Sequence, residues 1–107
     1  MKLRDASFYE ARARVAKALA HRSRLLILDA LQQREQCVCE LTERVGADQS
    51  TVSKHLAILK QAGLVEDRKE GTMVFYCIRV PCLEGFWQCI ESVLKENLRA
   101  QRTAVEG

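Results

Sequence analysis

The sequence has few of the residues that build long loops, and it has no long apolar run. One proline and five glycines among 107 residues leave most of the chain free to form regular secondary structure. No apolar run approaches the roughly 20 residues that a membrane span requires. The first five residues lead directly into charged sequence, so we expect no signal peptide, no membrane partner and a cytoplasmic location.

Signatures of catalysis are missing as well. The sequence contains no phosphate-binding loop and no Ser-His-Asp set, which predicts that the protein is not an enzyme. A hydrophobic content of 48% with 29% charged residues is typical of a globular chain. The length predicts one domain over residues 1–107, with a frayed tail from about residue 101. The net charge of +3 is a weak indication of a nucleic-acid partner.

Cysteine is the residue type that the chain has in unusual number. Five cysteines in so short a chain invite a disulfide interpretation. The odd number, the expected lack of an export signal and the reducing cytosol argue against disulfides, so we expect five reduced thiols. Thiolates are soft metal ligands and redox-active groups.

Hydrophobic periodicity predicts a mainly helical chain with one small β-hairpin. Helices are expected over residues 7–20, 23–33, 36–45, 48–63 and 81 to about 99, and strands over residues 64–68 and 73–78. The third and fourth helices are joined by a short turn at Gly46, which is typical of a helix-turn-helix. The hairpin follows directly, so the predicted fold is a winged helix-turn-helix.

The fourth helix has the pattern of a recognition helix. Val52, Leu56 and Leu59 fall on one arc, and the outward positions are short, polar and cationic at the start of the helix. Asp48 is placed to cap the beginning, and Gly63 to end the helix in a left-handed conformation. Such a helix fits a DNA major groove and brings hydrogen-bonding groups to base edges and phosphates.

The predicted wing and the two terminal helices have separate roles. Lys69 to Thr72 form the expected tip of the hairpin, where Arg68 and Lys69 would reach the phosphate backbone or the minor groove. The last helix carries more apolar surface than one small domain needs, and the first helix is rich in alanine. We therefore expect a homodimer that packs through these two helices.

At this point the sequence resembles the ArsR/SmtB family of metal-responsive repressors. The run Cys37-Val38-Cys39-Glu40-Leu41 resembles the arsenite-sensing branch of the family. The segment from Gln49 to Leu56 and the stretch Arg68-Lys69-Glu70-Gly71 also match. The resemblance implies a homodimeric repressor on operator DNA that As(III) or Sb(III) releases, with no organic cofactor. The DNA contacts that it implies are Gln49, Ser50, Thr51, Ser53, Lys54 and His55.

The helical wheel agrees for four of these six positions. It places Thr51 and His55 at the edge of the apolar arc. His55 is therefore expected to be half-buried, where it would steady the helix or touch a phosphate without reading bases.

The Cys-Val-Cys pair must satisfy a geometric condition. Side chains two residues apart in a regular helix differ by about 200° around the helix axis, so they cannot both coordinate one ion. Cys37 and Cys39 therefore chelate only if they lie at or before the first turn of the third helix. We hypothesise that a bound ion unwinds this turn and that the strain passes through Gly46 to the recognition helix.

The identity of a third thiol ligand stays open at this stage. Thr42 stands where the familiar family pattern has a further cysteine, and Cys77, Cys82 and Cys89 are the remaining candidates. Cys77 would approach Cys37 if the second hairpin strand paired with the segment before the third helix.

Two alternatives use the same scaffold. One is a thiol redox or persulfide switch, although Asp29 stands where persulfide-sensing relatives carry a cysteine. The other is a Cd, Pb or Zn sensor with four thiolates, from Cys37 and Cys39 with Cys82 and Cys89. The last helix has no histidine, which argues against the zinc site that relatives build there.

Overall fold

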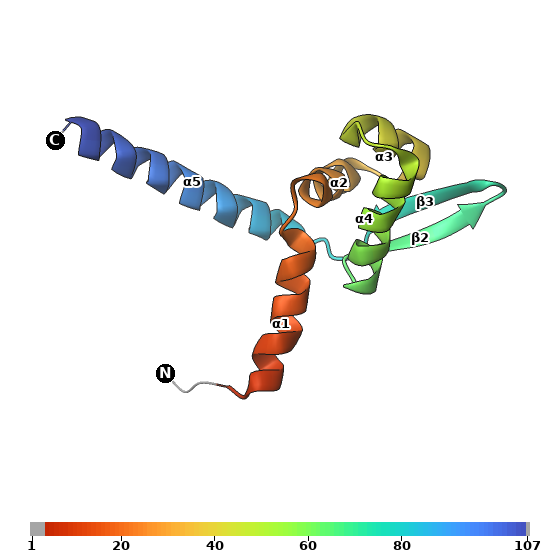
Figure 1. Ribbon diagram of the computed structural model, residues 1–107, viewed down its shortest axis with the longest axis horizontal. Helices are drawn as coiled ribbons and strands as arrows, with labels where there is room; N and C mark the ends of the chain where they lie inside the picture. The colour runs from red at the N-terminus through yellow and green to blue at the C-terminus, as the bar shows by residue number, and fades with distance from the viewer. Residues whose placement is uncertain (1–3, 107) are drawn as a thin grey trace.

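The computed structural model describes residues 4–106 and consists of five helices and a small three-stranded sheet. The helices are α1 (Ala6–Leu19), α2 (Arg22–Gln33), α3 (Val38–Val45), α4 (Gln49–Gln61) and α5 (Leu83–Glu106). The strands are β1 (Gln36–Cys37), β2 (Val65–Glu70) and β3 (Met73–Ile78). This order confirms the predicted winged helix-turn-helix. The hairpin of the sheet projects beside α3 and α4, on the side opposite to α5 (Figure 1).

The core lies where α2, α3 and α4 meet. Ile27 and Leu28 of α2 are fully buried, together with Leu41 of α3 and Leu56 and Leu59 of α4. The 3.6-residue period places these side chains on the inner faces of their helices, and their burial supplies most of the driving force for folding. The helix-turn-helix is therefore held against the central helix α2.

The sheet has the strand order β1-β3-β2. The pairs Gln36↔Tyr76 and Cys37↔Phe75 join β1 to β3 in antiparallel register, so the condition for Cys77 to approach Cys37 is met. Strand β2 extends to Glu70, which pairs with Met73. The turn is thus Gly71-Thr72, shorter than the expected four-residue tip, and Gly71 has the positive φ of 63° that this turn requires.

The predicted starts of two helices were wrong. The third helix begins at Val38, because Gln36 and Cys37 are extended and pair with β3. The last helix begins at Leu83, because Pro81 and Cys82 form a turn in which the Leu83 N–H donates to the carbonyl of Val80.

The expected frayed tail is helical from residue 101 to Glu106, while Gly107 lies outside the described residues. The segment contains strong helix formers and no proline or glycine before residue 107, so nothing in the local sequence ends the helix.

Helix α5 extends away from the rest of the molecule (Figure 1). Several of its apolar side chains are exposed. The exposed apolar side chains on it include Ile90, Val93, Leu94 and Leu98. Among residues 4–106, no helix combines the length and the apolar character that crossing a membrane would need.

Candidate nucleic-acid interface and thiol pair

The start of α4 is fixed by its own side chains. Asp48 caps the helix by accepting hydrogen bonds from the Thr51 N–H at 2.8 Å and from the Ser50 hydroxyl at 3.0 Å. Hydrogen bonds from Thr51 and Ser50 hold the pKa of the Asp48 carboxyl below its usual value, so the cap stays ionised. At the other end Gly63 has a φ of 85°, as predicted.

The outward face of α4 carries most of the predicted DNA contacts. The exposed residues there are Gln49, Ser50, Thr51, Ser53 and Lys54. Val52, Leu56 and Leu59 are fully buried on the opposite side. Thr51, which the wheel placed at the edge, therefore lies on the same exposed side as the others. The face is polar and cationic, which suits phosphate oxygens and base edges.

His55 lies at the edge of α4 and is half-buried, as predicted. Its Nδ1 accepts a hydrogen bond of 3.2 Å from Nε of Arg24 on α2, and its ring lies 4.4 Å from the ring of His21. Burial lowers the pKa of His55, and the neighbouring charges of His21 and Arg24 lower it further. The neutral imidazole thus connects the recognition helix to α2.

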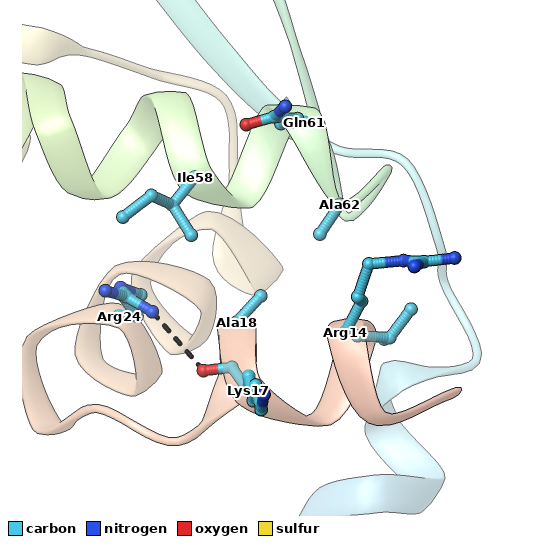
Figure 2. A pocket seen from close by; sticks show the side chains of 8 residues that line it. Arg14, Lys17, Ala18, Arg24, Ile58, Gln61 and Ala62 are labelled. Carbon is cyan, nitrogen blue, oxygen red and sulfur yellow. Dashed lines mark hydrogen bonds between the residues drawn. The ribbon is translucent and has the colours of Figure 1, made fainter. Parts of the chain in front are cut away.

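Arg24 is a residue whose role the sequence did not reveal. Its Nη1 also donates to the carbonyl of Lys17 at 3.3 Å, so one guanidinium contacts α1 and α4 from α2. It borders a cavity of about 520 Å³ between these helices. Figure 2 shows Ala18 of α1 facing Ile58 and Ala62 of α4 across it. The partners Arg24 and His55 are 31 residues apart, so no local pattern signals their contact.

The two cations predicted on the wing differ in their surroundings. The guanidinium of Arg68 forms a salt bridge to Glu35 at 2.6 Å and another to Glu70 at 2.6 Å, and it lies over the ring of Phe75. Lys69 is exposed. Arg68 therefore connects the wing to Glu35, just before β1. Its positive charge is already neutralised by Glu35 and Glu70.

Cys37 and Cys39 lie together at the beginning of α3. Cys37 is the N-cap residue, and its Sγ accepts a hydrogen bond of 3.3 Å from the Glu40 N–H, while Cys39 is in the first turn. The two Cα atoms are 5.3 Å apart, and the sulfurs are joined in a disulfide. The expectation of five reduced thiols is therefore wrong in this structure. The extended backbone at Cys37 turns its sulfur toward Cys39, which a count of cysteines does not reveal.

The other three cysteines form no disulfide, and Cys77 lies two residues along β3 from Phe75, the partner of Cys37. Cys77 is partly buried, with its Sγ 3.8 Å from a carboxylate oxygen of Glu66. Burial raises the pKa of the Cys77 thiol, and the charges of Glu66 and Glu35 raise it further. Cys82 and Cys89 are exposed. Within residues 4–106, no three His, Cys, Asp or Glu side chains come together in a group that would hold a metal ion.

The thiol pair opens onto a cavity that also borders the recognition helix. The cavity has a volume of about 260 Å³. It is lined by Cys37, Val38 and Cys39, by Gln49 and Ser53 of α4, and by Thr72, Met73, Val74 and Tyr76 of the wing. The sequence predicted the cysteines and the α4 residues separately, and the wing residues Met73 and Tyr76 as strand positions only. The fold brings all of them to one place.

An exposed polar helix held in a helix-turn-helix, with a hairpin beside it, defines a winged helix-turn-helix DNA-binding regulator. Comparisons with known proteins agree. Residues 21–67 match the family model described as "Bacterial regulatory protein, arsR family". The chain belongs to the ArsR family of DNA-binding transcriptional regulators, and it is not an enzyme.

Individual relatives cover most of the chain. An uncharacterized regulator of Mycobacterium tuberculosis, Rv0081, is 35% identical over 98 residues, which are 91% of this chain and 85% of the relative. Its crystal structure has a TM-score of 0.80, with 32% identity over 91% of this chain and 98% of that one.

Two further relatives are a homodimeric domain and a repressor of an arsenical resistance operon. The solution structure of a homodimeric winged helix-turn-helix domain of Mycobacterium bovis, Mb0332, has a TM-score of 0.76 at 37% identity and covers 94% of this chain and 93% of that one. The arsenical resistance operon repressor of Escherichia coli is 33% identical over 91 residues, 78% of each chain.

Proposed function

We propose that this protein is a homodimeric repressor that binds operator DNA through α4 and releases it when the thiolates of Cys37 and Cys39 bind As(III) or Sb(III). The observation that carries the proposal is the position of the two sulfurs. They meet at the first turn of α3, the helix that precedes the recognition helix. Soft thiolates in a preformed pair suit a soft metalloid ion.

The DNA contacts in this proposal come from α4 and the wing. Gln49 and Ser50 would read base edges, and Lys54 would contact a phosphate together with Ser53 and Thr51. His55 would act mainly by bracing the helix, since its Nδ1 is occupied by Arg24. From the wing we assign the main phosphate contact to Lys69, because Arg68 is already bound to Glu35 and Glu70.

A homodimer is supported by the uncovered apolar face of α5 and by the homodimeric relative Mb0332. We propose that α1 and α5 form the interface. The two recognition helices would then lie about 34 Å apart, which is one turn of DNA.

The capping bond at α3 offers a route from the thiols to α4. The Cys37 sulfur caps α3 by accepting from the Glu40 N–H, and a sulfur bound to a metalloid is a poorer acceptor. Helix α3 ends at Gly46, whose N–H donates to the carbonyl of Thr42, and α4 follows three residues later. A change in the first turn of α3 would therefore move the start of α4. Release needs a coupling free energy of roughly 1–3 kcal/mol between the two sites.

The test is a release titration on the reduced protein bound to its operator. As(III), Sb(III), Cd(II), Zn(II) and a persulfide donor are added separately, and bound DNA is followed by fluorescence anisotropy. Cys37→Ser with Cys39→Ser should bind DNA normally and no longer respond to arsenite. The matched control, Cys82→Ser with Cys89→Ser, should respond like the unmodified chain. Release of the first variant by arsenite would reject the proposed site.

A second candidate is a thiol redox switch at the same pair. The disulfide between Cys37 and Cys39 favours it, since the folded chain accommodates the oxidised form. Oxidised and reduced protein are compared for operator affinity without any metalloid. Equal affinities would rule out the redox candidate, while a difference that the Cys37→Ser variant abolishes would support it.

A further inference from the structure

We propose that the cavity between α1, α2 and α4 is a second effector site, which binds a small organic carboxylate with an apolar body. The site is independent of the thiol pair, because the cavity beside the thiols shares none of its lining residues. The proposal follows from the charges that border the cavity, from the apolar side chains between them and from the contacts of Arg24.

The charged side chains that border the cavity are all basic. They are Arg14 and Lys17 of α1 and Arg24 of α2, and no aspartate or glutamate lines the same space. None of the salt bridges within residues 4–106 involves any of these three cations. Cations that border one cavity repel one another, and an anion bound between them relieves that repulsion. The cavity therefore favours a negatively charged ligand.

Most of the remaining lining is apolar. It is formed by Val15 and Ala18 of α1 and by Ile58 and Ala62 of α4. Val15 and Ile58 are each 38% exposed, so apolar surface is left in contact with water. The volume of about 520 Å³ lies within the range of roughly 300–1,000 Å³ that is typical of sites for small organic molecules. An inorganic anion would leave this surface uncovered, whereas an aromatic or aliphatic carboxylate would bury it.

The guanidinium of Arg24 is already held in position for such a ligand. Its Nε donates to Nδ1 of His55, and its Nη1 donates to the carbonyl of Lys17, as Figure 2 shows for the second bond. Its Nη2 donates no hydrogen bond within residues 4–106. A guanidinium fixed through two nitrogens binds a carboxylate through the third with little further loss of side-chain freedom. Arg24 is therefore the expected partner of the carboxylate.

The proposed dimer leaves this side of α1 available. At about 100° per residue, Tyr9 and Ala16 lie on the side of the helix opposite to Arg14 and Ala18. Both Tyr9 and Ala16 are exposed in the single chain. We expect the partner subunit to cover that opposite side, so the cavity stays accessible to a ligand.

Arg24 also connects the cavity to the recognition helix. The lining residues of α4 are Ile58, Gln61 and Ala62, whereas the predicted DNA contacts lie between residues 49 and 55. A ligand in the cavity would therefore not cover the DNA-reading face. It would instead share the guanidinium that braces His55, and a weaker brace should lower the affinity of α4 for the operator.

The first experiment is a calorimetric titration of the full chain carrying Cys37→Ser and Cys39→Ser, so that thiol chemistry plays no part. Naphthoate is the probe, and its neutral isostere naphthamide and inorganic phosphate are the controls. Naphthoate should bind at least about tenfold more tightly than either control, because only naphthoate has both the charge and the apolar body. Equal binding of naphthoate and either control would overturn the inference.

A pair of charge variants tests the basic border. Arg14→Gln with Lys17→Gln should weaken naphthoate binding by about tenfold. The matched control, Arg12→Gln with Arg102→Gln, removes the same net charge at exposed positions outside the lining and should leave binding unchanged. Equal losses in the two double variants would overturn the assignment of the cavity.

A cavity-filling variant tests the apolar part and does not change the charge. Val15→Trp, at a partly exposed position, should prevent naphthoate binding because the indole takes the space of the naphthalene rings. Tyr9→Trp, on the opposite side of the same helix, should have no effect. Unchanged binding to the Val15→Trp variant would place the ligand elsewhere.

Operator affinity separates an effector site from a DNA contact. Saturating naphthoate should lower the operator affinity by about fivefold or more, and an unchanged affinity would overturn the effector role. If naphthoate does not bind and the Arg14→Gln, Lys17→Gln variant lowers the salt slope of operator binding by about two units, these cations contact phosphates and the inference fails. None of these results depends on Cys37 or Cys39, so the proposed function is tested separately by arsenite release.

Discussion

Arg24 on α2 and His55 on α4 are joined by a hydrogen bond of 3.2 Å from Nε to Nδ1. A protonated imidazole would carry a hydrogen on Nδ1 and would no longer accept this bond. The same guanidinium also contacts the carbonyl of Lys17 on α1 (Figure 2). The recognition helix is therefore connected to α1 and α2 through a neutral histidine.

The first prediction concerns the pH dependence of stability. The folded pKa of His55 lies below the ordinary value of 6.5, so the unfolded chain binds a proton at a higher pH than the folded chain does. The contribution of neutral His55 to the free energy of unfolding is fully present above pH 6.5. It is lost as the pH falls through 6.5 toward the lower pKa of His55 in the folded chain. Thermal unfolding from pH 7.5 to pH 5 should show this loss, and His55→Gln should reduce it.

The control for this prediction is His21→Gln, which leaves the Arg24–His55 hydrogen bond in place. His21 caps α2 and its charge contributes to the lowered pKa of His55, so this variant should lower stability and reduce the pH dependence only in part, because burial is the largest cause of that lowered pKa. A His55→Gln variant with the same pH profile as the unmodified chain would contradict the assignment.

The second prediction separates phosphate contacts from base contacts on α4. Lys54→Ala should weaken binding to all DNA sequences and reduce the salt dependence by about one unit in the logarithmic slope, because one phosphate contact is lost. Gln49→Ala should instead change which operator bases are preferred. Anisotropy titrations at several salt concentrations measure both effects. A Lys54→Ala variant with an unchanged salt slope would show that this side chain does not contact a phosphate.

The third prediction concerns the salt bridge between the wing and Glu35. The Arg68 guanidinium keeps the pKa of the Glu35 carboxyl below its usual value, so Glu35 neutralises Arg68 at neutral pH. Arg68→Ala should therefore weaken DNA binding less than Lys69→Ala does. Glu35→Gln should leave Arg68 paired with Glu70 alone and strengthen binding in low salt, which the same titrations measure. Equal losses for Arg68→Ala and Lys69→Ala would contradict this account.

The fourth prediction concerns the apolar face of α5. Leu94 is 62% exposed in the single chain, and Leu94→Glu would place a charge in the proposed dimer interface. We expect the dissociation constant of the dimer to rise by roughly 100-fold, which sedimentation equilibrium measures. Ser92→Glu, which introduces the same charge at a polar position of α5, should leave the dimer intact. An unchanged dimer in Leu94→Glu would place the interface elsewhere.

The helices and strands could be predicted from the sequence wherever residues close together in the chain determine where they begin and end. Asp48 caps α4 and Gly63 ends it, because capping and left-handed turns depend on residues a few positions apart. The tail after residue 100 was predicted wrongly, since its helix depends on continuity with the long helix before it. The third helix was two residues too long in the prediction, because pairing of Gln36 and Cys37 with β3 is a tertiary contact.

The candidate site was predictable in its parts and unpredictable in its assembly. Cys37 and Cys39 were singled out by their spacing, and the polar side of α4 by its period. The disulfide between the two cysteines was not expected, and neither was the cavity that Cys39 shares with Gln49 and Met73. The contact between Arg68 and Glu35 spans 33 residues and leaves no periodic signal.

The sequence by itself determined the family, the order of helices and strands, and the face of α4 that points away from the core. These properties follow from local periodicity and from the capping residues, which act within one or two helical turns. Only the tertiary structure decided that the two sulfurs meet, that Arg24 braces His55, and that the thiols, the wing and the recognition helix border one cavity. Those relations depend on how distant segments pack against α2, and packing is a property of the whole chain.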